Sequence, residues 1–125
     1  MKTVGLALVA LIAALHVYIA WFEIFAWTTV APSVFKSMDP AIFEPTVKLG
    51  ANQGVYNLFL AIGLGWSLVI KDAQWQRNIA TCFLAFVAIA GAFAAITVEV
   101  RPGLMQLVPS VIALALLHMN KESAG

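Results

Sequence analysis

The chain has 125 residues, of which 62% are hydrophobic and only 10% are charged. Soluble domains carry about 25% charged residues, so this composition argues against a soluble monomer and indicates an integral membrane protein. A net charge of +1 provides no basic surface for nucleic acid, and the single cysteine, Cys82, cannot form an internal disulfide. Because the sequence has no zinc-type Cys/His spacing and no glycine-rich phosphate loop, we expect neither a metal nor a cofactor.

Four apolar runs are long enough to cross a bilayer, for which a helix needs about 20 residues. They cover residues 4–27, 49–70, 78–98 and 103–118. Each run must be helical, because lipid cannot satisfy the hydrogen bonds of an open backbone. The sequence therefore predicts an all-α fold, a four-transmembrane-helix bundle that forms a single membrane domain over residues 1–125.

The first connection differs from the other two. Residues 28–48 are long, semi-apolar and interrupted by three prolines, which predicts an interfacial, partly helical capping loop between the first two helices. Ser33 and Asp39 are candidate caps for short helices, and Pro40 suits a first helical position. The other connections are predicted to be short polar turns over residues 71–77 and 99–102.

Four spans place both termini on one side of the membrane. The terminal side carries four basic residues and the other side carries three: Lys2, Lys71, Arg77 and Lys121 against Lys36, Lys48 and Arg101. This small excess predicts cytoplasmic termini and also permits dual topology. We expect the first run to remain as a span, because no small-x-small cleavage site follows it.

The first helix carries two ionisable residues, and such groups within a span indicate function. His16 and Glu23 are seven residues apart and so lie on one helix face, which Trp27 joins four residues further on. Two structural alternatives stay open: His16 donates one hydrogen bond to a neighbouring helix, or Glu23 pairs with Arg101 or is capped by Asn52 or Gln53 for folding alone.

Polar residues of all four helices fall in the membrane half opposite the termini. They are Glu23, Asn52, Gln53, Asn57, Glu99, Arg101 and Gln106. The other half contributes almost no buried polar group. We infer a polar pocket in that half, covered by the capping loop and walled by Trp27 and Tyr56.

Two motifs resemble one family of short bacterial membrane proteins. The first is the run His16-Val17-Tyr18-Ile19 with Glu23 and Trp27-Thr28-Thr29, and the second is Ala51-Asn52-Gln53-Gly54-Val55-Tyr56-Asn57. The family is the domain of unknown function 1304. The resemblance covers nearly the whole chain. It implies four spans and the bacterial inner membrane, and it implies no established activity.

Three functions compete. We favour a protein that binds or converts an amphipathic small molecule, as a proton-transfer isomerase or hydrolase would. His16 and Glu23 would be its acid/base pair. The substrate-binding residues would be Trp27, Asn52, Gln53, Tyr56, Asn57, Glu99, Arg101 and Gln106. The alternatives are a small proton-coupled multidrug-type exporter and a non-catalytic membrane subunit. Membrane lipid is an expected partner, and a homo-oligomer stays open.

Overall fold

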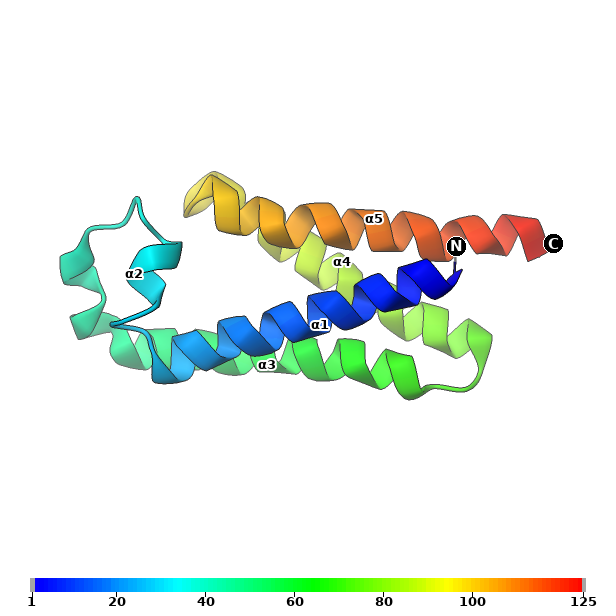
Figure 1. The fold of residues 1–125 in the computed structure, drawn as a ribbon, viewed down its shortest axis with the longest axis horizontal. Helices are drawn as coiled ribbons and strands as arrows, with labels where there is room; N and C mark the ends of the chain where they lie inside the picture. Colours follow the sequence, from blue (N-terminus) through cyan, green and yellow to red (C-terminus); the bar gives the residue numbers. More distant parts are fainter. Residues whose placement is uncertain (1, 125) are drawn as a thin grey trace.

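The computed structural model describes the backbone of residues 2–124 and the side chains as far as residue 119. The described chain is entirely helical (Figure 1). Its elements are α1 (Lys2–Phe25), α2 (Ala31–Val34), the 3₁₀ helices η1 (Pro40–Ile42) and η2 (Glu44–Thr46), α3 (Val47–Val69), α4 (Ala73–Thr97) and α5 (Val100–Ala124).

Three of the described helices are long and apolar enough to cross a membrane. They are Lys2–Phe25, Ala73–Thr97 and, within α5, Val100–Met119. This finding is consistent with a multi-pass membrane protein and supports three of the four predicted spans. The helix α3 is comparably long, but Asn52, Gln53 and Asn57 lower the hydropathy of its first half.

The helix α4 starts earlier than the sequence suggested. The prediction of a polar turn over residues 71–77 is wrong for residues 73–77, which form the first turn of α4. The cause is Asp72, whose carboxylate accepts a hydrogen bond from the backbone N–H of Trp75 at 2.9 Å. A side-chain acceptor at this position satisfies one of the unpaired N–H groups of the helix start.

The long helices form two pairs, because α1 packs mainly against α3 and α4 mainly against α5. Glycines allow each pair to approach closely: a Cβ on Gly54 would lie 2.6 Å from Ile24 of α1, and one on Gly91 would lie 2.7 Å from the backbone nitrogen of Leu107 in α5. Small residues have this use in helices that pack within a membrane.

The two pairs close on each other at the end that holds both termini and separate toward the other end (Figure 1). At the closed end, one buried core takes residues from all four long helices: Val9, Ile12, Leu64, Ala80, Leu84, Val87, Ala113 and Leu117. At the open end, residues 28–46, here called the cap, contain α2, η1 and η2. A second core of Phe22, Ala26, Ala31 and Phe43 attaches the cap to α1.

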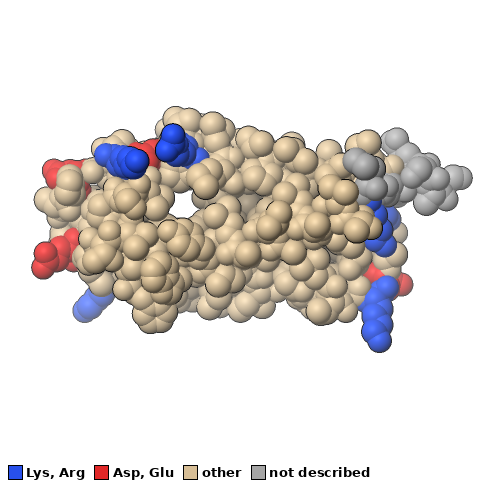
Figure 2. Space-filling view, in the orientation of Figure 1, with Lys and Arg blue, Asp and Glu red and all other residues tan. Residues whose placement is uncertain are grey.

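The cap agrees with the sequence-based expectation of a partly helical segment. Asp39 caps η1 by accepting the backbone N–H of Ala41 at 2.9 Å, and Pro40 occupies the first position. Charged side chains gather at the two ends of the visible face, and the broad middle carries none (Figure 2). This distribution suits a protein whose middle lies in hydrocarbon.

Candidate functional site

A cavity of about 850 Å³, here called the main cavity, lies between the two helix pairs beside the cap. Figure 2 shows an opening through the molecule in this region. The lining comes from the cap and from all four long helices. Its polar members are Glu23, Ser33, Lys36, Gln53, Asn57, Glu99, Arg101 and Gln106, and its aromatic members are Tyr18, Phe22, Trp27 and Phe35.

Glu23 is the buried carboxylate on this wall, with 6% of its surface exposed. Its Oε1 accepts a hydrogen bond from the side-chain amide of Asn57 at 2.5 Å. Among the described residues no hydrogen bond reaches Oε2, and no basic group forms an ion pair with Glu23 within 4.0 Å. The alternatives of an ion pair with Arg101 or a cap from Asn52 or Gln53 therefore do not describe this carboxylate.

The helix α3 divides its polar residues between two faces. Gln53 and Asn57 line the main cavity, and Asn57 reaches Glu23. Asn52 and Tyr56, which the sequence placed in the same pocket, are exposed and do not belong to the lining. The reason is the helix phase, because Gly50 and Gly54 turn their face toward α1, and residues 52 and 56 then point to the other side.

Trp27 lies where α1 passes into the cap. Its indole N–H donates to the Thr46 hydroxyl at 2.9 Å, and its ring packs against Phe35 and Phe43 at centroid distances of 6.1 and 5.3 Å. A Cβ on Gly50 would lie 2.5 Å from the same ring. Trp27 therefore fixes the cap on α3 as well as contributing to the cavity wall.

Glu99 joins the cap to the turn between α4 and α5. Its carboxylate accepts the backbone N–H groups of Ser37 at 2.6 Å and Lys36 at 3.1 Å. Hydrogen bonds from the hydroxyl and backbone of Ser37 hold the pKa of Glu99 below its ordinary value, and the backbone N–H and charge of Lys36 act in the same direction. Arg101 follows two residues later, exposed and on the cavity wall.

His16 lies in the closed part of the fold and is not among the residues that line the main cavity. It is fully buried, and Nδ1 donates a hydrogen bond to the Ile12 carbonyl at 2.9 Å. That bond assigns the proton to Nδ1 and leaves Nε2 as an acceptor. Among the described residues, Nε2 is the one buried side-chain nitrogen or oxygen without a hydrogen-bond partner. His16 and Glu23 therefore do not form a hydrogen-bonded pair.

Gln106 is the polar side chain between these two regions. It lines the main cavity, its amide donates to the Pro102 carbonyl at 3.3 Å, and it is a close neighbour of the His16 ring although the two make no hydrogen bond within 3.5 Å. Its amide N–H is a donor of the kind that Nε2 lacks.

Sequence reasoning missed three polar residues of the site, and it did not predict the aromatic lining by Tyr18, Phe22 and Phe35. Lys36 and Ser33 lie in the cap and line the main cavity, and Thr46 anchors Trp27. No periodic pattern marks them, because the cap contains only short helices. The charge of Lys36 beside a predicted pocket mouth was the one signal available.

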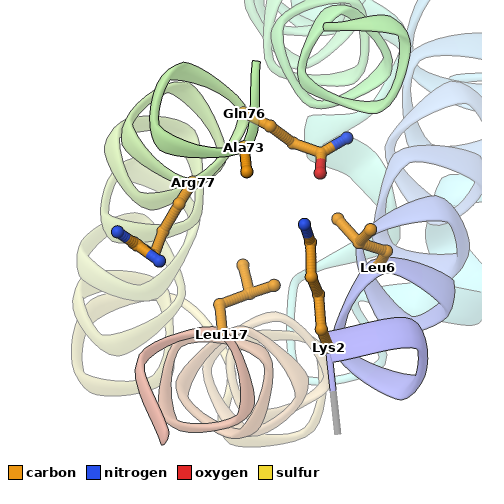
Figure 3. A pocket seen from close by; sticks show the side chains of 6 residues that line it. All are labelled: Lys2, Leu6, Ala73, Gln76, Arg77 and Leu117. Atoms are coloured by element: carbon orange, nitrogen blue, oxygen red, sulfur yellow. The ribbon is translucent and has the colours of Figure 1, made fainter. Parts of the chain in front are cut away.

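A second, small cavity lies at the closed end (Figure 3). Lys2 and Gln76 point toward one another across it, and Leu117 of α5 forms another side. Its volume of about 20 Å³ is enough for roughly one water molecule and too small for an organic ligand. The main cavity is therefore the candidate ligand site.

The described residues form an all-helical fold with three helices long and apolar enough to cross a membrane, which is consistent with a multi-pass membrane protein. The chain belongs to the family described as "Protein of unknown function (DUF1304)", whose model matches residues 10–118. This match confirms the resemblance based on the motifs around His16 and Asn52. No curated protein and no solved structure matches the chain.

Proposed function

We propose that the chain is a four-span protein of the bacterial inner membrane that binds an amphipathic small molecule in the main cavity and exchanges a proton with it through Glu23. The observation that carries this proposal is a carboxylate 6% exposed, with one hydrogen-bond partner, on the wall of a cavity of about 850 Å³. A carboxyl group held among apolar walls is a recurrent proton donor and acceptor.

The proposal takes α3 as the fourth span. Its 23 residues extend roughly 34 Å at about 1.5 Å per residue, which matches a hydrocarbon core about 30 Å thick. It packs along α1, which is itself apolar enough to cross a membrane. Gln53 and Asn57 line the cavity, and of these two amides Gln53 is also exposed, as Asn52 is. The argument for cytoplasmic termini is the small excess of basic residues on the side that holds both ends of the chain.

The architecture supports the pocket hypothesis over the exporter hypothesis. An exporter of the multidrug type would need Glu23 of two copies to face a shared cavity. Here one chain surrounds Glu23 with its own helices and cap. The subunit hypothesis would need the polar set to face outward, whereas Glu23, Gln53 and Asn57 line the cavity, and Asn52 and Tyr56 are exposed outside its lining.

One pair of variants tests whether the ligand occupies the main cavity. The full chain is purified into nanodiscs, and co-purified small molecules are identified by native mass spectrometry. Ala94→Trp places a large ring in the cavity wall and should remove the bound molecule, and Ala115→Trp adds the same ring to an exposed position outside the lining and should retain it. A molecule retained equally by both variants would place the ligand elsewhere.

Glu23→Gln tests the role of the carboxyl group, because the amide keeps the shape and loses the exchangeable proton. We expect weaker binding of the co-purified molecule and the loss of any proton release or uptake on binding, measured by calorimetry in buffers of different ionisation enthalpy. Glu44→Gln, an exposed cap carboxylate outside the lining, is the matched control. Identical proton exchange in Glu23→Gln and the native chain would remove Glu23 from the proposal.

A further inference from the structure

Among the described residues, the charged side chains of the main cavity that form no hydrogen bond or ion pair are basic. Both carboxylate oxygens of Glu99 accept cap N–H groups, and Glu23 accepts from Asn57. Lys36 and Arg101 are on the cavity wall, and neither forms an ion pair within 4.0 Å among the residues that the structure describes. A ligand at this mouth therefore meets two cations that form no ion pair, although the charge of Lys36 also acts on the nearby Glu99 carboxylate.

Glu99 holds the backbones of these two cations at one edge of the cavity. The Glu99 carboxylate accepts the backbone N–H of Lys36, and Arg101 follows Glu99 by two residues in the sequence. Figure 2 shows basic side chains flanking an acidic one beside the opening. Lys36 of the cap and Arg101 in the first turn of α5 both line the main cavity, and lysine and arginine side chains recognise carboxylate and phosphate groups.

Below this edge the part of the wall that α4 forms is apolar. The lining continues down α4 through Ala94 to Ala90, nine residues from Glu99, which corresponds to roughly 13 Å at about 1.5 Å per residue. Leu15 reaches a similar depth on α1. Apolar walls offer water no hydrogen bonds, so hydrocarbon is the favoured occupant of this part.

The main cavity also has an open side between α1 and α5. Tyr18 of α1 and Met105 of α5 both line it, and yet they are 49% and 53% exposed. Residues that belong to a cavity wall and to the outer surface mark its rim. In a membrane this rim faces lipid, so a chain-bearing molecule can enter sideways without passing through water.

We infer that the ligand is an amphiphile with an anionic headgroup, a carboxylate or a phosphate, held by Lys36 and Arg101 with its hydrocarbon chain between α1 and α4. This inference rests on the proposed function and specifies the chemical class of its ligand. A cationic amphiphile would instead need an uncommitted acidic group at the mouth, and Glu99 is bound to the cap.

The test measures binding of four probes with matched chains to the full chain in nanodiscs of zwitterionic lipid. The probes are palmitate, a palmitoyl lysophosphatidate, palmityl alcohol and hexadecyltrimethylammonium. We expect palmitate, lysophosphatidate or both to bind at least about tenfold more tightly than the alcohol, as a charge-assisted contact provides. Palmitate alone identifies a fatty acid as the source of the headgroup, and lysophosphatidate alone identifies a phospholipid.

The double variant Lys36→Gln/Arg101→Gln should lower the affinity of the anionic probe about tenfold and leave the alcohol unchanged. Lys48→Gln, an exposed cation outside the lining, is the control and should change neither. Equal affinity for anionic and neutral probes, or a preference for the ammonium probe, would overturn the headgroup assignment and leave the cavity proposal intact. Failure of all four probes to bind would count against both.

Discussion

The carboxylate of Glu99 accepts a hydrogen bond from the backbone N–H of Ser37 at 2.6 Å, across 62 positions of the sequence. With the neighbouring bond from Lys36, this contact attaches the cap to the turn between α4 and α5. It is thus a tie between the two helix pairs at the end where they separate. On the other side the cap is held by the core around Phe22 and by the Trp27–Thr46 hydrogen bond, so the Glu99 contact is its attachment to the α4–α5 pair.

Glu99→Ala should loosen the cap without unfolding the helices. Because the acceptor of both N–H groups is lost, we expect faster amide hydrogen exchange over residues 35–38, and little change in the buried core at the closed end. Mass-spectrometric exchange on the protein in nanodiscs measures this. Glu44→Ala, an exposed carboxylate of the same cap, is the control. Unchanged exchange at residues 36 and 37 would show that other contacts hold the cap.

The same tie predicts a pH dependence. The pKa of Glu99 is lowered in the folded protein, chiefly by Ser37, so the carboxylate form is the one that stabilises the cap. The stabilisation is complete above the ordinary pKa of 4.5 and is lost as the pH falls through the lowered value. We expect exchange at residues 36 and 37 to accelerate below about pH 4.5, after correction for the intrinsic rate, and this acceleration to be absent in Glu99→Gln.

Close packing of α1 on α3 gives a prediction about stability. A Cβ on Gly54 would lie 2.6 Å from Ile24 and 3.0 Å from the Ala20 carbonyl, and so the helices must separate to admit it. We expect Gly54→Ala to destabilise the protein by about 1–3 kcal/mol, as overpacking does. Denaturant unfolding in detergent micelles measures this change.

The control for this prediction lies on the same helix. A Cβ on Gly65 would meet no neighbouring atom within 4 Å, and so Gly65→Ala should be neutral or stabilising by up to about 1 kcal/mol through helix propensity. Similar effects of the two substitutions would mean that the α1–α3 contact does not limit the stability of the fold.

Much of the architecture could be predicted, because hydropathy and helix length are local properties of the sequence. Three helices apolar enough to cross a membrane and a partly helical cap follow from such signals. Hydropathy did not reveal where α4 begins, since one capping carboxylate, Asp72, recruits a polar segment into the helix. A helix start of this kind is predicted by recognising one capping residue and is not visible in the average hydropathy of the segment.

The site was harder to predict, because it depends on helix phase and on contacts between distant segments. The sequence grouped Glu23, Asn57 and Gln106, and in the structure all three line the main cavity. Asn52 and Tyr56 share the polar run with Asn57, and only the packing of Gly54 against α1 separates their faces. The contact of Glu99 with two cap N–H groups involves backbone donors, and side-chain patterns carry no information about it.

The contact between Glu23 and Asn57 gives the last prediction. Asn57→Leu preserves the approximate volume and removes the one donor to the buried carboxyl group. Hydrogen bonds between helices in membranes contribute about 0.6 kcal/mol on average and up to about 1.7, so we expect a loss of about 1 kcal/mol. The measurement is unfolding in micelles of Asn57→Leu, Glu23→Leu and the double variant.

The double-mutant cycle separates the free energy of the Glu23–Asn57 hydrogen bond from the effect of removing each buried side chain. We expect Glu23 and Asn57 to be coupled by about 1 kcal/mol, since each single substitution already removes the bond. The parallel cycle of Glu23 with Asn52 should be additive within about 0.5 kcal/mol, because Asn52 is exposed on the other face of α3. Additivity in both cycles would mean that the bond contributes nothing to stability, and the role of Asn57 would then be to orient the carboxyl group toward the cavity.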